Sequence, residues 1–287
     1  MATARDRTIV ANRLRHHLLD WGGDGPILLL LHGLLEHAHA WDFVAPQLVA
    51  AGYRVLALDW RGHGDSEWVG AGGYYHFVDY TADLAFIVRA LGGAVTLVGH
   101  SMGSVASIMY AGTEPERVRA LVAIDALGPP DSPPAVAPDR FVTWIADLER
   151  VADRGGQQPI TLAAASARLA ERFPRFSTAV AAHMALHGTS AAGATRRWKF
   201  DPLHQSRTPQ PYFVAQARAF WERITCPVLY IDGGDSPLVL EDADRADRLA
   251  TLRARRVTLA GVGHHPHLEV PTELAQVLLS FLRETPA

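Results

Sequence analysis

The stretch Val98-Gly99-His100-Ser101-Met102-Gly103 decides the fold of this chain. An apolar run that begins at Val95 precedes it, and a run with helical spacing follows it. A serine between two glycines at such a strand-to-helix junction is typical of a nucleophile presented on a sharp turn. The glycines are needed because a side chain at either place would strike the neighbouring strand or helix. The sequence therefore predicts that Ser101 projects above a sheet as a nucleophile.

Short apolar runs alternate with longer amphipathic runs on both sides of this turn. The expected strands are Ile27–Leu31, Arg54–Leu58, Val95–Gly99, Ala120–Ile124, Val228–Ile231 and Arg256–Leu259. The expected helices are Trp41–Ala51, Val78–Leu91, Ser104–Gly112, Ala243–Leu252 and Thr272–Arg283. These strands are too apolar to have a solvent-exposed face, so helices are expected to cover both faces of the sheet. This predicts an α/β fold with a mostly parallel central sheet flanked by helices. Ahead of them, Arg7–Val10 and Arg13–Leu19 are expected to pair as an antiparallel edge hairpin.

The alternation stops between Asp125 and Ile224, where helical patterns occur without a convincing strand. We therefore expect a core domain formed by residues 1–125 and 225–287, interrupted by a helical cap at residues 126–224. The expected cap helices are Arg140–Ala152, Leu162–Arg172, Thr178–His187 and Tyr212–Arg223.

Composition and charge exclude several classes of partner. The net charge is −3 and no basic stripe is present, so a nucleic-acid partner is not expected. The polar N-terminus lacks the apolar stretch of a signal peptide, and no apolar run approaches the roughly 20 residues of a membrane span. We expect a cytoplasmic protein without a membrane partner, and the sequence leaves its oligomeric state open.

The motif Gly99-His-Ser-Met-Gly103 has three companions: His32-Gly33, Asp59-Trp-Arg-Gly-His-Gly-Asp-Ser66 and Gly263-His264. Together they resemble the α/β-hydrolase superfamily from about residue 27 to 282, the cap excepted. The resemblance implies the chain order nucleophile, acid, histidine, with His264 as the general base for Ser101. It also implies that no cofactor is required.

Two residues compete for the role of the acid that orients His264. In many α/β-hydrolases this acid stands three residues beyond a glycine after the post-cap strand, but that place, counted from Gly233, holds Ser236. Asp235 lies one residue before that expected acid position. In other members, including certain haloalkane dehalogenases, the acid ends the strand that closes here at Asp125. Asp125 is the preferred candidate, and Asp235 stays open as the alternative.

The resemblance also implies an oxyanion hole made by the backbone N–H groups of Leu34 and Met102. Both side chains are apolar, which favours a small, largely apolar acyl substrate. The residues expected to line the substrate pocket are His32, Gly33, His100, Trp144 and Trp221.

His264, His265 and His267 place three imidazoles within four residues, a spacing that suggests a metal-binding cluster. No further set of ligands at metal spacing accompanies them, and Pro266 constrains their loop. We therefore expect no metal, with His265 and His267 as loop fillers.

The hypothesis that follows is a serine hydrolase that cleaves a carboxylic ester, a lactone or a related acyl compound through an acyl-enzyme. The alternatives are a C–C bond hydrolase, a thioesterase or a cofactor-free perhydrolase on the same triad, and a ligand receptor with low turnover.

Overall fold

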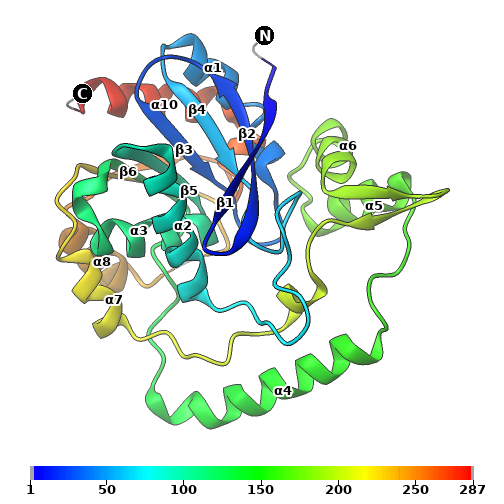
Figure 1. Ribbon diagram of the computed structural model, residues 1–287. Coiled ribbons are helices and arrows are strands. Elements are labelled where there is room, and N and C mark those ends of the chain that lie inside the picture. The colour runs from blue at the N-terminus through cyan, green and yellow to red at the C-terminus, as the bar shows by residue number, and fades with distance from the viewer. Residues whose placement is uncertain (1–2, 239, 286–287) are drawn as a thin grey trace.

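One eight-stranded sheet forms the centre of the computed structural model, which describes residues 3–238 and 240–285 (Figure 1). The strand order is β1-β2-β4-β3-β5-β6-β9-β10. The bounds are β1 (Arg5–Ala11), β2 (Leu14–Gly22), β3 (Ile27–Leu31), β4 (Arg54–Leu58), β5 (Val95–His100), β6 (Val118–Ile124), β9 (Val228–Gly233) and β10 (Arg255–Leu259). From β4 to β10 every pairing is parallel, which confirms the predicted α/β class.

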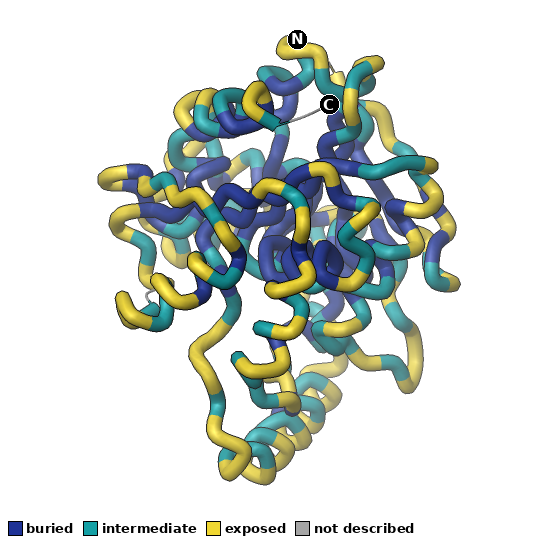
Figure 2. The backbone as a smooth tube through the Cα atoms, turned by 90° about the vertical axis from the view of Figure 1, so that its left-hand side faces the viewer, coloured by how far each residue is buried: buried dark blue, intermediate teal, exposed yellow. Residues whose placement is uncertain are grey.

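The central strands are buried on both faces because their side chains alternate between two apolar layers. In β3, Leu29 and Leu31 point into one layer, whereas Leu28 and Leu30 point into the other. The first layer is covered by α2 (Phe77–Leu91), α3 (Met102–Thr113), α7 (Val214–Trp221) and α8 (Asp242–Leu252). The second is covered by α1 (Ala45–Ala50) and α10 (Pro271–Glu284). The buried residues accordingly concentrate at the sheet in Figure 2.

Two edges of the sheet differ from its centre. At one edge, β1 and β2 pair antiparallel as predicted, across a tight turn at Asn12 and Arg13 with φ of 47° and 67°. At the other edge, β10 exposes Arg255 and Arg256, so the expectation that this strand is buried on both sides is wrong. Only one neighbouring strand pairs with β10, which leaves part of it facing solvent.

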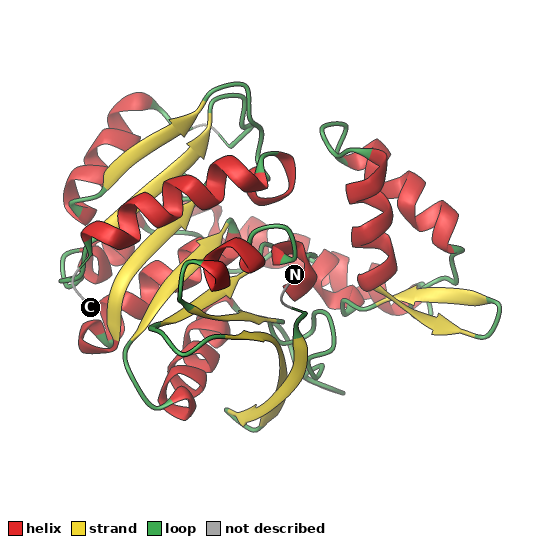
Figure 3. Cartoon of the chain, turned by 90° about the horizontal axis from the view of Figure 1, so that it is seen from above, coloured by secondary structure: helices red, strands yellow, loops and turns green. Residues whose placement is uncertain are grey.

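The segment between β6 and α7, residues 126–213, is called the insertion below. Its helices are α4 (Ala137–Asp153), α5 (Leu162–Arg172) and α6 (Thr178–His187). It also contains a hairpin of β7 (Thr189–Ala192) and β8 (Thr195–Trp198), which the sequence analysis did not predict. These strands are only four residues long and mostly polar or small, so they lack an apolar alternation. In Figure 3 this hairpin and two neighbouring helices stand to one side of the sheet.

Helix α7 corrects the predicted cap boundary at residue 224. It lies directly against α3: a Cβ on Gly112 would come within 2.3 Å of the Phe220 carbonyl oxygen. Ala217, Trp221 and Ile224 join the apolar layer under the sheet. This helix therefore belongs to the core, and its amphipathic pattern alone did not distinguish a core helix from a cap helix.

The insertion contacts the core through a small apolar cluster. Phe176, Ala181 and Met184 of the insertion pack with Ala40 and Leu268, which lie in η1 (Ala38–Trp41) and α9 (Pro266–Glu269) of the core. No helix among residues 3–238 and 240–285 is long and apolar enough to cross a bilayer.

Candidate active site

Ser101 stands on a sharp turn between β5 and α3. Its φ of 51° and ψ of −114° are strained for a residue with a side chain. A Cβ on Gly99 would lie 2.4 Å from the Gly103 carbonyl oxygen, and one on Gly103 would lie 2.3 Å from the Leu31 carbonyl oxygen. Glycine is thus required at both places, for the steric reason expected from the motif.

Three side chains from separate loops form a continuous hydrogen-bonded row. His264 Nε2 lies 3.1 Å from Ser101 Oγ, and His264 Nδ1 lies 2.6 Å from Asp125 Oδ2. Asp125 follows the last residue of β6 and is buried, whereas His264 lies in the loop before α9. The carboxyl ends of parallel strands meet at one edge of the sheet, which brings these distant residues together.

Of the two candidate acids, the structure brings only Asp125 to His264. The Asp235 side chain is 55% exposed and faces Arg175, with 3.4 Å between its Oδ2 and the guanidinium. The placement of Asp235 beside His264, kept open by the sequence, is therefore wrong. Ser236, which occupies the other expected acid position, donates its hydroxyl to Asp125 Oδ2 at 2.5 Å, and the Gly233 N–H donates to Oδ1 at 3.1 Å.

Leu34 and Met102 line the cavity next to Ser101. Met102 opens α3, where the first N–H groups of a helix have no partner within the helix. The Leu35 N–H, one residue beyond Leu34, donates to His63 Nε2 at 3.2 Å and is thus occupied. Burial lowers the pKa of His63, so this ring is neutral and can accept that bond. Among the described residues, neither the Leu34 N–H nor the Met102 N–H has a hydrogen-bond partner.

A buried group that sequence reasoning missed lies behind this loop. The Glu36 carboxylate is 3.0 Å from His100 Nδ1 and 3.2 Å from His267 Nε2, and it accepts the Gly33 N–H at 3.2 Å. Although burial opposes the charge, His100 and His267 hold the pKa of Glu36 well below its usual range. A carboxylate three residues after His32-Gly33 was the available signal.

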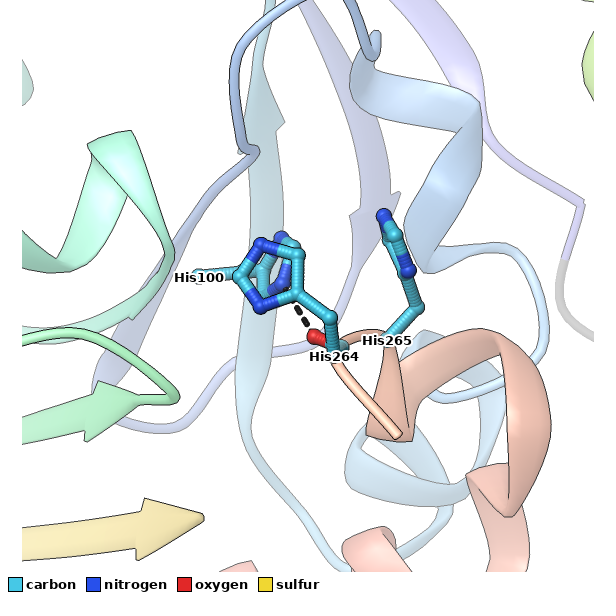
Figure 4. Close-up of side chains that lie close together, drawn as sticks. All are labelled: His100, His264 and His265. Carbon is cyan, nitrogen blue, oxygen red and sulfur yellow. Dashed lines mark hydrogen bonds between the residues drawn. The ribbon is translucent and has the colours of Figure 1, made fainter. Parts of the chain in front are cut away.

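His100 connects this buried carboxylate to the catalytic histidine candidate. Its Nε2 donates to the backbone carbonyl of His264 at 2.7 Å, the dashed line in Figure 4. His265 is buried against Phe173 and Phe176, so the description of His265 and His267 as mere loop fillers is wrong. Glu36, His100 and His267 have donors that could hold a metal, but they already fix the backbone at Gly33 and His264.

The cavity above Ser101 has a volume of about 1220 Å³ and a mainly apolar wall. Of the five predicted pocket residues, Trp144 of α4 lines it. His32, Gly33 and His100 lie behind the lining residues: His32 Nε2 accepts the Trp60 N–H, and its Nδ1 donates to the Gly33 carbonyl. Trp221 packs in the core layer and does not reach the described cavity wall, because α7 is a core helix.

Comparisons with known proteins agree with this architecture. Over 108 residues the chain is 39% identical to an esterase of Mycobacterium tuberculosis, which covers 37% of this chain and 35% of that protein. It is 29% identical to Epoxide hydrolase A of the same species, with 98% of each chain covered. Among solved structures, the thioesterase domain from the curacin biosynthetic pathway matches with a TM-score of 0.84 and 26% identity, covering 96% of this chain and 99% of that one.

The extent of these matches differs. The chain spans about a third of the length of that esterase and 44% of an epoxide hydrolase from Siraitia grosvenorii. The family model described as the alpha/beta hydrolase fold matches residues 26–271, which is most of the chain and includes Ser101, Asp125 and His264. This chain therefore belongs to the α/β-hydrolase family.

Proposed function

We propose that this chain hydrolyses a carboxylic ester or a related acyl compound through an acyl-enzyme on Ser101. The observation that carries the proposal is the row of Ser101, His264 and Asp125, joined at 3.1 Å and 2.6 Å on the wall of an apolar cavity. A serine hydroxyl is a poor nucleophile until a base takes its proton. His264 Nε2 takes that proton as Oγ attacks, and Asp125 stabilises the resulting imidazolium.

The remaining steps use the same groups. The N–H groups of Leu34 and Met102 stabilise the oxyanion of the tetrahedral intermediate. The intermediate collapses as the bond to the leaving group breaks, and His264 gives its proton to that leaving group. Water then attacks the acyl-enzyme with His264 again as base, which releases the acid and restores the Ser101 hydroxyl.

The residue at the nucleophile position argues for acyl transfer. Epoxide hydrolases and dehalogenases of similar architecture form an alkyl ester on a carboxylate, and the place of that carboxylate is held here by Ser101. The likeness to Epoxide hydrolase A is consequently support for a hydrolase and not for epoxide opening.

A thioester with a negatively charged carrier is the second candidate. Arg168 and Arg172 lie four residues apart on α5 and line the cavity. Within residues 3–238 and 240–285 neither side chain forms an ion pair with a carboxylate. Two such guanidinium groups suit an anionic group at the far end of the substrate. The likeness to the curacin thioesterase domain supports the same bond type.

The test compares wild type with Ser101→Ala on p-nitrophenyl esters of increasing chain length and on matched acyl-coenzyme A thioesters. We expect turnover by wild type and a fall of about 10⁴-fold or more in kcat for the variant. A higher kcat/KM for the thioesters would select the second candidate. Binding of these compounds without turnover above the Ser101→Ala background would overturn the proposal and favour a ligand receptor.

A further inference from the structure

We propose that His39, Asp42, His183 and His187 form a binding site for a divalent transition metal, for which Zn²⁺ is the best match. These four side chains are called the His39 cluster below. His39 lies in η1 and Asp42 directly follows it, so both belong to the core. His183 and His187 lie on α6 of the insertion. None of the four takes part in the proposed hydrolysis.

The spacing along the chain places the donors on facing surfaces. His183 and His187 are four residues apart on α6 and therefore share one face of the helix. His39 and Asp42 are three residues apart, and His39 Nδ1 lies 2.9 Å from Asp42 Oδ2. Across the gap, the His39 and His187 rings stack with their centroids 3.7 Å apart. The core and the insertion thus each supply two donors.

The distances are close to those that a metal ion requires. Zn–N and Zn–O bonds of about 2.1 Å in tetrahedral geometry place the donor atoms about 3.4 Å apart. Asp42 Oδ2 is 2.9 Å from His39 Nδ1 and 3.1 Å from His183 Nε2. Donor atoms of His39, Asp42 and His187 all lie within 4.8 Å of one another. The stacked His39 and His187 rings would have to turn apart for both to point a nitrogen at one ion.

The chemistry of the cluster fits the same class of ion. Three imidazoles and one carboxylate are preferred ligands of Zn²⁺ and its neighbours in the first transition row. The side chains of His39, Asp42 and His183 are 20%, 24% and 22% exposed, which gives an ion access from solvent.

The buried cluster of Glu36, His100 and His267 is a weaker candidate for the same ion. All three are buried, and Glu36 is already engaged by the Gly33 N–H. An ion there would have to displace bonds that fix the catalytic loops. In the His39 cluster, the side-chain hydrogen bonds among described residues that an ion would displace are those between the ligands and one from His183 Nε2 to the His39 carbonyl.

A bound ion would fasten α6 to the core loop that follows the candidate oxyanion residue. This contact already contains a bond between His37 Nε2 and the Met184 carbonyl at 3.1 Å. We therefore expect the ion to stabilise the contact between the insertion and the core.

The experiment titrates Zn²⁺ into metal-free, full-length protein by calorimetry and records the visible spectrum with Co²⁺. We expect one ion per chain, a tetrahedral Co²⁺ spectrum, and a rise in Tm of about 5 °C at a hundredfold excess over Kd. His187→Gln and Asp42→Asn should each weaken binding at least about tenfold. Glu36→Gln and His264→Ala are the matched controls and should keep the ion.

Three results would overturn the proposal. The first is that wild type does not bind the ion, and the second is that both His187→Gln and Asp42→Asn bind it as tightly as wild type does. The third is loss of the ion in Glu36→Gln or His264→Ala, which would place the ion near Glu36 or His264 instead. The His187 side chain makes no hydrogen bond to any residue that the structure describes, so His187→Gln tests the ligand role even if Asp42→Asn loosens the fold.

Discussion

The sheet and the insertion are stabilised in different ways. Every residue of β3 from Leu28 to Leu31 is fully buried, and each contributes about 1.5–3 kcal/mol through burial. In α4, by contrast, Asp147 is the one buried residue among seventeen. The three residues of the candidate triad all belong to loops at the sheet, whereas the insertion supplies cavity wall. Changes at the sheet should therefore alter chemistry or stability, and changes in the insertion should alter substrate binding.

The largest expected effect lies at the end of β6. Asp125→Asn removes the charge that stabilises the His264 cation and permits the wrong tautomer of the ring. We expect kcat to fall by about 10⁴-fold while the protein stays folded, because the amide oxygen can still accept the Gly233 N–H and the amide NH2 can donate to the Ser236 hydroxyl oxygen. Steady-state kinetics on the best ester or thioester measure this fall.

Asp235→Asn is the matched control for that prediction. Asp235 lies on the same side of the sheet but is exposed and faces Arg175, so its variant should keep kcat within about twofold of wild type. Equal losses in both variants would show that the row from Ser101 to Asp125 does not act as a catalytic unit.

The acid illustrates what sequence can predict. The motif places Ser101 and His264 by chain order, and the apolar strands place them at one sheet edge. The choice between Asp125 and Asp235 depends on the backbone after β9, where Ser236 turns toward Asp125 and Asp235 turns outward. A loop of a few residues has no periodic pattern, so the sequence does not predict which of its side chains point toward the sheet and which point to solvent. The Glu36 network was missed because its partners come from three segments that lie far apart in the sequence: Gly33 after β3, His100 at the end of β5 and His267 in α9.

Helix boundaries in the insertion were predictable, but their packing was not. Thr161 and Ser177 accept backbone N–H bonds as N-caps of α5 and α6, so local sequence fixes where those helices begin. The same local signals do not say which layer a helix joins. Helix α7 has an amphipathic pattern like its predecessors, and it is its packing against Gly112 of α3 and in the apolar layer under the sheet that shows that it belongs to the core.

An intermediate effect, on stability, is expected at the contact between α3 and α7. In Gly112→Ala, the new Cβ would lie 2.3 Å from the Phe220 carbonyl oxygen, so α3 and α7 must separate. We expect the free energy of unfolding to fall by about 1–3 kcal/mol, as in other overpacked cores. Chemical denaturation monitored by circular dichroism gives this value.

Gly93→Ala provides the comparison for Gly112→Ala. A Cβ on Gly93 meets no atom within 4 Å, and its backbone does not have a positive φ, so this variant should be neutral or slightly stabilising. If Gly112→Ala proved equally neutral, α7 would be a loosely attached part of the insertion, and the predicted boundary at residue 224 would be restored.

The smallest effect is expected at the one buried residue of α4. Asp147 accepts two guanidinium bonds from Arg207, at 2.8 and 3.0 Å, and one from Arg150 at 2.7 Å, and both arginines line the cavity. In Asp147→Asn these side chains lose the charge that positions them, so we expect KM to rise about threefold to tenfold with kcat nearly unchanged. Steady-state kinetics on short and long acyl substrates check this, with Asp139→Asn on the exposed face of α4 as control. A fall in kcat with constant KM would mean that the insertion positions the triad, and the division between sheet and insertion would fail.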